Sequence, residues 1–158
     1  MMICLVTLLC GCGIIARGIA AGMMDSKDIP ERTGQVMEGK GTLGDFDIEI
    51  LEARKTKTYD DDAAVVITYR WTNHSKQTLA FEEALDATVY QDGIELEWTI
   101  EGGDKMPSDD GYVKIKPGKS FEISVVYQLR SDSPDIEVEV SEGFPYHGFI
   151  VKKSFTLK

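Results

Sequence analysis

Cysteine is missing from most of this 158-residue chain, because its three cysteines, Cys4, Cys10 and Cys12, all lie in the first twelve residues. The remainder therefore has no thiol for a disulfide, for thiolate catalysis or for a zinc site. Basic residues are also scarce, since 17 Lys and Arg stand against 27 Asp and Glu and give a net charge of -10. An acidic surface repels the phosphate backbone, so the composition excludes nucleic acid as a partner.

Long helical patterns are missing as well. Beyond residue 45, no segment repeats apolar residues at spacings of three and four over ten or more positions. A length of 158 residues with 42% hydrophobic content suits one globular domain, since a domain usually needs about 100 to 150 residues to enclose a core. The sequence therefore disfavours a multidomain enzyme.

One apolar run stands out at the N-terminus, where residues 3–15 read ICLVTLLCGCGII. As a helix these thirteen residues would span roughly 20 Å, too short for a hydrocarbon layer of about 30 Å, and their length is typical of a secretory signal. Leu9-Cys10-Gly11-Cys12 resembles a lipobox, which implies that residues 1–12 form a lipoprotein signal and that Cys12 carries the lipid. Two acyl chains such as palmitate would anchor the protein to the outer face of the membrane.

An uncleaved helix from Met1 to Met24 is the alternative for the same segment. Its 24 residues would span roughly 36 Å, with Arg17 near the outer end. Both alternatives stay open, and both place the rest of the chain at a membrane surface. Residues 13–44 then form a predicted tether, because residues 25–44 are polar and contain four glycines and one proline.

Alternation of apolar and polar residues dominates residues 45–158. In the clearest strand, Val65, Ile67, Tyr69 and Trp71 fall on one side, and the residues between them fall on the other. Residues 81–87 favour at most one helical turn. The pattern predicts about eight strands, at residues 46–53, 65–72, 84–90, 94–100, 112–115, 121–130, 136–141 and 149–157.

Two turn sequences support this interpretation. Asp92-Gly93 provides the two positive φ angles of a type I′ turn, which predicts a tight hairpin closed by Gln91 and Ile94. Pro117-Gly118 predicts a type II turn before the strand at residues 121–130. Short alternating strands joined by such turns indicate an all-β fold, an antiparallel β-sandwich of immunoglobulin-like type.

Three motifs resemble one known family. They are Thr72-Asn73-His74-Ser75 at a strand end, the hairpin Gln91-Asp92-Gly93, and the turn Pro117-Gly118. Over roughly residues 41–158 the chain is similar to the Gram-positive lipoprotein domain of unknown function numbered five-zero-six-seven. The resemblance implies an extracytoplasmic sandwich without a known activity, because the shared motifs are structural and not catalytic.

Catalytic motifs are not apparent in the predicted domain. It contains two histidines, His74 and His147, and neither lies in a Gly-x-Ser-x-Gly elbow or a His-Glu-x-x-His helix. A triad through either histidine stays an alternative, but partly solvated loop histidines explain the same residues. We therefore expect a protein that is not an enzyme.

Clustered carboxylates form a candidate metal site. Asp60, Asp61 and Asp62 lie in one predicted loop, and Asp109 and Asp110 lie in another. Calcium takes six to eight oxygen ligands, so these residues could bind it if the two loops meet at one end of the sandwich. Solvated acidic turns explain the same residues without a metal, and no other cofactor is predicted.

A loop with several aromatic residues is the candidate partner contact. Phe144, Tyr146 and His147 lie in a segment punctuated by glycine and proline. If exposed, the rings would form a contact patch for a partner protein or a glycan. If buried, they would close one end of the sandwich, and burial is the favoured interpretation because an exposed cluster promotes aggregation.

The residues together predict a non-enzymatic bacterial cell-surface lipoprotein. Its membrane contact would be the lipid anchor, and its sandwich would act as an interaction module for a surface or wall protein. The alternative is an extracytoplasmic domain that binds a small ligand or a divalent cation such as calcium.

Overall fold

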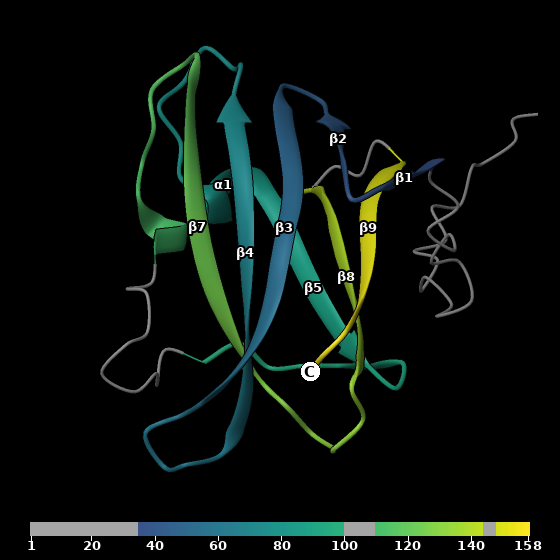
Figure 1. The fold of residues 1–158 in the computed structure, drawn as a ribbon. Helices are drawn as coiled ribbons and strands as arrows, with labels where there is room; N and C mark the ends of the chain where they lie inside the picture. Colours follow the sequence, from purple (N-terminus) through teal and green to yellow (C-terminus); the bar gives the residue numbers. More distant parts are fainter. Residues whose placement is uncertain (1–34, 100–109, 144–147) are drawn as a thin grey trace, which may run out of the picture. The chain divides into compact units, whose positions relative to one another are not determined.

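A computed structural model describes residues 35–99, 110–143 and 148–158 of the chain. These residues belong to one compact unit, Arg32–Lys158, and form two β-sheets packed face to face (Figure 1). The order of the strands is β1-β9-β8-β5-β6 in one sheet and β2-β3-β4-β7 in the other. The antiparallel sandwich predicted from the sequence is confirmed, with nine strands in the described ranges where about eight were expected.

The elements have the following bounds in chain order: β1 Gln35–Glu38, β2 Lys40–Leu43, β3 Phe46–Lys57, β4 Ala63–Asn73, α1 Phe81–Ala84, β5 Leu85–Gln91, β6 Ile94–Glu95, the 3₁₀ turn η1 Asp110–Tyr112, β7 Lys119–Gln128, β8 Asp135–Glu142 and β9 Phe149–Thr156. Helix α1 matches the single helical turn expected at residues 81–87. Within the part of the chain described, no helix has the length and apolarity needed to cross a membrane.

Strand β4 forms the centre of the core. Its residues Val65, Ile67, Tyr69 and Trp71 are each 0% exposed and face the opposite sheet. Burying one large apolar side chain stabilises the fold by about 1.5 to 3 kcal/mol, so this single strand contributes a large share of the core. The ring of Phe81, which begins α1, packs at 5.4 Å from Tyr69 and 6.0 Å from Trp71 between ring centroids.

The first two strands lie in the segment that the sequence indicated as a tether. Strand β1 pairs in parallel with β9, and β2 pairs antiparallel with β3. The chain passes from one sheet to the other at Gly39, whose φ of 68° favours glycine. The folded domain therefore extends at least to Gln35, ten residues before the expected start at residue 45.

The two predicted turns are confirmed. Gln91 pairs with Ile94 across a two-residue turn in which Asp92 and Gly93 have φ angles of 54° and 76°. At the second turn Gly118 has a φ of 74°, and the amide of Lys119 donates to the carbonyl of Lys116 at 3.2 Å.

Two predicted strands are corrected. The strand expected at 94–100 is reduced to β6, because the chain leaves that sheet and the amide of Thr99 donates to the Val126 carbonyl of β7 in the other. The strand expected at 112–115 is replaced by η1 and by a single bridge between Ile115 and Leu79. In both places the sequence continues to alternate apolar and polar residues while the chain changes direction. A periodic pattern does not reveal such a change.

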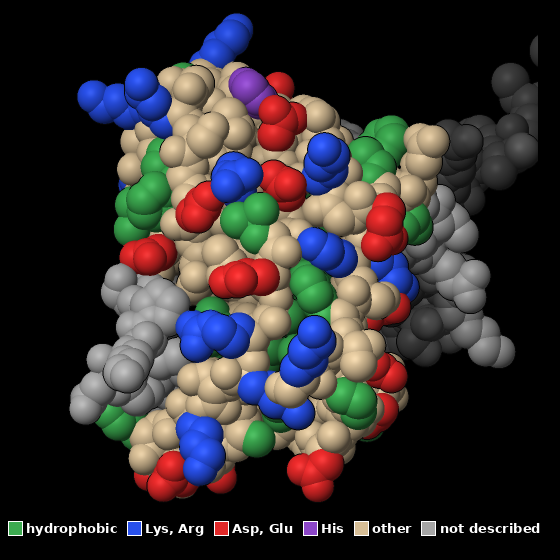
Figure 2. All heavy atoms as spheres, in the orientation of Figure 1, with side chains coloured by type: hydrophobic (Ala, Val, Ile, Leu, Met, Phe, Trp, Pro, Cys, Tyr) green, Lys and Arg blue, Asp and Glu red, His purple; other side chains and the backbone are tan. Residues whose placement is uncertain are grey.

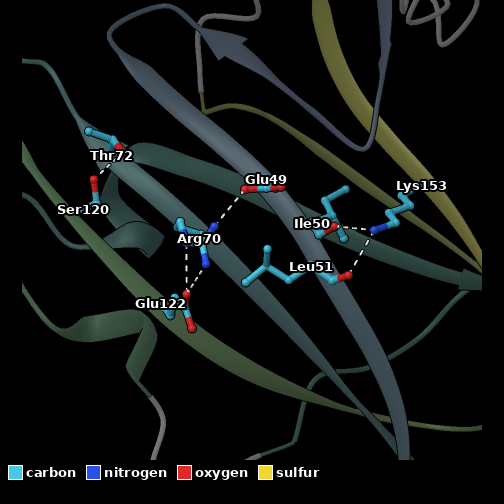
Figure 3. Close-up of polar contacts among 8 residues, drawn as sticks. All are labelled: Glu49, Ile50, Leu51, Arg70, Thr72, Ser120, Glu122 and Lys153. Carbon is cyan, nitrogen blue, oxygen red and sulfur yellow. Dashed lines mark hydrogen bonds and ion pairs between the residues drawn. The ribbon is translucent and has the colours of Figure 1, made fainter.

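Lys153 connects the two sheets at one edge. Its position opposite Val138 turns its side chain toward the core side of β9. Its Nζ donates hydrogen bonds to the carbonyl oxygens of Ile50 at 2.7 Å and Leu51 at 3.0 Å (Figure 3). These carbonyls belong to a bulge in β3, where the pairing with β4 skips Leu51. The bulge thus presents two acceptors that one ammonium group satisfies.

We predict that Lys153→Met lowers the free energy of unfolding by about 1 to 2 kcal/mol, because the variant loses charge-assisted hydrogen bonds and keeps most of the apolar stem. The matched control is Lys152→Met on the outer face of the same strand, whose ion pair with Glu137 is partly exposed. It should cost less than about 1 kcal/mol. Urea denaturation measures both, and equal losses would contradict a specific role for Lys153.

Candidate functional site

Two rows of polar side chains cross the outer face of the four-stranded sheet. Within β3 and β4 every second residue faces the core, so the residues between them face outward. The register aligns these residues from β2 to β7 as Lys40, Glu49, Arg70 and Glu122 in the first row and Thr42, Asp47, Thr72 and Ser120 in the second. We call these eight residues the polar face.

The first row is organised by Arg70, which lies between two carboxylates (Figure 3). Its Nε and Nη2 donate to Oε1 of Glu122 at 3.0 and 2.6 Å, and its Nη1 donates to Oε2 of Glu49 at 3.1 Å. The hydrogen bonds that Arg70 donates to Glu122 raise the pKa of Arg70. All three side chains are between 41% and 54% exposed, so these ion pairs add little stability. Their effect is to hold the charged groups in fixed positions.

The second row is held by hydroxyl groups. Thr42 Oγ1 donates to Oδ1 of Asp47 at 2.7 Å, and the hydroxyls of Thr72 and Ser120 lie 2.7 Å apart. Nε2 of His74, just beyond β4, lies 2.7 Å from Oδ2 of Asp47. The hydrogen bond from His74, followed by that from Thr42, lowers the pKa of the Asp47 carboxyl. Both oxygens of Asp47 are thus oriented by neighbours.

The polar face contains an open groove. The groove has a volume of about 420 Å³ and is lined by parts of β2, β3 and β4, including Lys40, Asp47, Glu49, Arg70 and Thr72. Figure 2 shows acidic and basic side chains interspersed over this side of the domain, with hydrophobic side chains only in small patches. Six residues of the polar face therefore line the groove and offer it oriented donors and acceptors.

A second groove, of about 350 Å³, lies on the outer face of the other sheet, near the hairpin of β5 and β6. Its three carboxylates already bind neighbours of their own. Asp92 accepts from Ser131, Asp135 accepts from Thr156, and Glu137 pairs with Lys152. We take the polar face as the stronger candidate site, because its groove has the larger volume and its side chains form continuous rows across four strands.

The described carboxylates of the candidate calcium site lie on different elements. Asp60, Asp61 and Asp62 form the tight turn before β4, whereas Asp110 begins η1, which contacts α1 and β7. Asp61 pairs with Lys57 at 3.2 Å. In the described ranges no group of three or more His, Cys, Asp or Glu side chains is arranged to hold a metal ion.

Several predicted site residues lie outside the described residues. They are the lipobox residues Leu9, Cys10, Gly11 and Cys12, the loop carboxylate Asp109, and the aromatic-loop residues Phe144, Tyr146 and His147.

The sequence analysis did not single out the polar face. Its residues are ordinary polar partners in an alternating pattern, and only the pairing of β2, β3, β4 and β7 aligns them in rows.

Buried polar residues that support the loops were also missed. The Asn73 side chain donates to the carbonyls of Gln77 and Ile115, and the Gln91 side chain donates to those of Ser131 and Ser133.

Comparison with known proteins identifies a family and a structural relative. The family model for Domain of unknown function (DUF5067) matches residues 24–142, which confirms the expected resemblance. Among solved structures, an uncharacterized β-sandwich protein from Clostridium difficile 630 matches with 14% identity and a TM-score of 0.47, covering 75% of this chain and 95% of that chain. None of the curated proteins matches.

The depressed pKa of Asp47 predicts a pH dependence of stability. Because the carboxyl is more acidic in the folded state, its contribution is present above the unfolded pKa of about 3.9 and is lost as pH falls through the lower folded pKa. Asp47→Asn should therefore melt up to about 3 °C below the parent at pH 7, and the difference should shrink as the pH falls below the unfolded pKa of about 3.9. Thermal melts at a series of pH values provide the measurement.

Thr42→Val is the control for this series, because it keeps the carboxyl and removes one of its two donors. The melting temperature of Thr42→Val should also lie below that of the parent, but by less than that of Asp47→Asn. If the difference in melting temperature between Asp47→Asn and the parent is the same at every pH, it would contradict a lowered pKa of Asp47 in the folded state.

For calcium, we predict no change in melting temperature at millimolar concentration, since the described carboxylates do not converge. Thermal melts with calcium and with magnesium at equal ionic strength test this. A rise specific to calcium that Asp61→Asn abolishes would contradict the solvated-turn interpretation.

Proposed function

We propose that this chain, which belongs to the family Domain of unknown function (DUF5067), is a non-enzymatic cell-surface lipoprotein whose β-sandwich is a binding module. The observation that carries the proposal is the polar face, where eight side chains on four strands are aligned and six of them line an open groove. A sheet face that only needed to be soluble would not require a fixed arrangement of donors and acceptors. Pre-ordered groups lower the entropic cost of binding a ligand.

Anchoring is proposed from the N-terminal sequence. The apolar run at residues 3–15 contains Leu9-Cys10-Gly11-Cys12, whose likeness to a lipobox favours lipidation of Cys12. Two acyl chains give stable membrane attachment, where one would be marginal. The sandwich would then be displayed on the outer face of the membrane, where surface and wall components are available as partners.

Binding without catalysis is proposed from the contacts of the polar face. His74, the histidine at its rim, is bonded to the Asp47 carboxylate. The described hydroxyls of the polar face are instead bonded to a carboxylate or to one another, as in Thr42 with Asp47 and Thr72 with Ser120. A hydroxyl nucleophile activated by histidine bonds to the imidazole, and His74 bonds to the Asp47 carboxylate instead. The arrangement therefore supports recognition better than covalent chemistry.

Cysteine substitutions test the anchor in a Gram-positive host. We predict that the membrane-extracted protein begins at a diacylglyceryl-modified Cys12 by mass spectrometry, and that Cys12→Ala loses both the lipid and the membrane attachment. Cys4→Ala is the matched control, because it removes a cysteine of the same apolar run outside the lipobox. An unmodified Met1 in the membrane fraction, or equal lipid labelling of both variants, would contradict the proposal.

A further inference from the structure

We propose that the polar face binds an electrically neutral, hydroxyl-rich ligand, which in chemical terms is an oligosaccharide. The inference rests on the proposed function, because it names the ligand class of that binding module. It is carried by three properties of the eight residues: the balance of their charges, the density of their hydrogen-bonding groups, and the size of the array.

Charge balance excludes ionic polymers. Along the first row the charges alternate from Lys40 through Glu49 and Arg70 to Glu122. Asp47 adds the one carboxylate of the second row, so three carboxylates stand against two cationic side chains. A polyanion would meet these carboxylates and an acidic domain, and a polycation would meet Arg70 at the centre. A ligand without net charge avoids both costs.

Hydrogen-bonding capacity matches hydroxyl groups. Each hydroxyl of a sugar both donates and accepts, so it needs acceptors and donors side by side. The polar face supplies carboxylate oxygens on Asp47, Glu49 and Glu122, and it supplies donors on Arg70, which uses three of its five N–H groups in the contacts with Glu49 and Glu122. The hydroxyls of Thr72 and Ser120 can act in either sense.

Apolar ligands have little to bind there. The eight residues include no aliphatic or aromatic side chain, and the apolar side chains of β3 and β4 between them face the core. A lipid tail or an apolar peptide face would therefore have to displace water from charged groups. This property separates a hydroxyl-rich ligand from a hydrophobic one.

The size of the groove favours a short chain of sugars. The two rows that border it are two residues apart, about 7 Å, and each row crosses three strand spacings, about 14 Å. The groove volume of about 420 Å³ lies within the range typical of small-molecule sites.

An array of defined neutral, anionic and cationic glycans tests the ligand class. The probe is the full chain, held in a detergent without a sugar headgroup so that the detergent does not compete. We expect binding to neutral glycans, confirmed for the strongest by calorimetric titration. Thr72→Val and Glu49→Gln should each weaken this binding about tenfold, because each removes a hydrogen-bonding or charged group of the groove and keeps the side-chain shape.

Matched controls lie on the other sheet. Thr156→Val removes an exposed hydroxyl that binds Asp135, and Glu137→Gln neutralises a carboxylate that binds Lys152. Both should leave the affinity within about twofold of the parent, since they lie away from the polar face. Thermal melts of all four variants separate a loss of binding from a loss of folding.

The inference is overturned if no glycan binds, if only charged glycans bind, or if the polar-face variants bind as well as the controls. A protein partner whose binding depends on Thr72 and Glu49 would overturn it too, and would leave the proposed binding module standing. If Cys12 is not lipidated, only the proposed function is affected, because the glycan array measures ligand binding by the polar face independently of membrane attachment.

Discussion

The alternation of β4 is the constraint on which both the core and the polar face depend. Tyr69 and Trp71 are fully buried on one side of the strand, and Arg70 and Thr72 lie on the other. A shift of one residue in the pairing would expose the aromatic rings and bury the guanidinium at the same time. Core packing therefore fixes the positions of the polar side chains, and the polar face requires no separate stabilisation.

The edges of the sandwich depend on contacts that cross between the sheets. On one side, the chain changes sheets at Gly39, and Lys153 binds the two carbonyls of the β3 bulge. On the other, the amide of Thr99 binds the Val126 carbonyl in β7. These contacts limit the free edge that each sheet presents, and an unpaired edge is a site for unwanted strand association. The same bulge bends β3 beside Glu49, which belongs to the polar face.

Sequence patterns predicted the fold class, the central strands and both glycine turns because each follows from a local rule. Asp92-Gly93 requires positive φ angles, and residues 67–73 of β4 alternate between buried and more exposed positions. Strands β1 and β2 were missed, because four-residue strands with few apolar side chains carry almost no periodic signal. The polar face was missed for a different reason: its rows join residues up to about eighty positions apart, and only the strand order reveals that they are neighbours.

The register between β4 and β7 is the central claim, and a disulfide trap measures it directly. In a chain without its native cysteines, Thr72→Cys with Ser120→Cys places two thiols at directly paired positions. The account predicts that this pair oxidises almost completely under native conditions, whereas Thr72→Cys with Phe121→Cys, one residue out of register, stays reduced. Oxidation of the second pair in preference to the first would contradict the register, and with it the arrangement of both the core and the polar face.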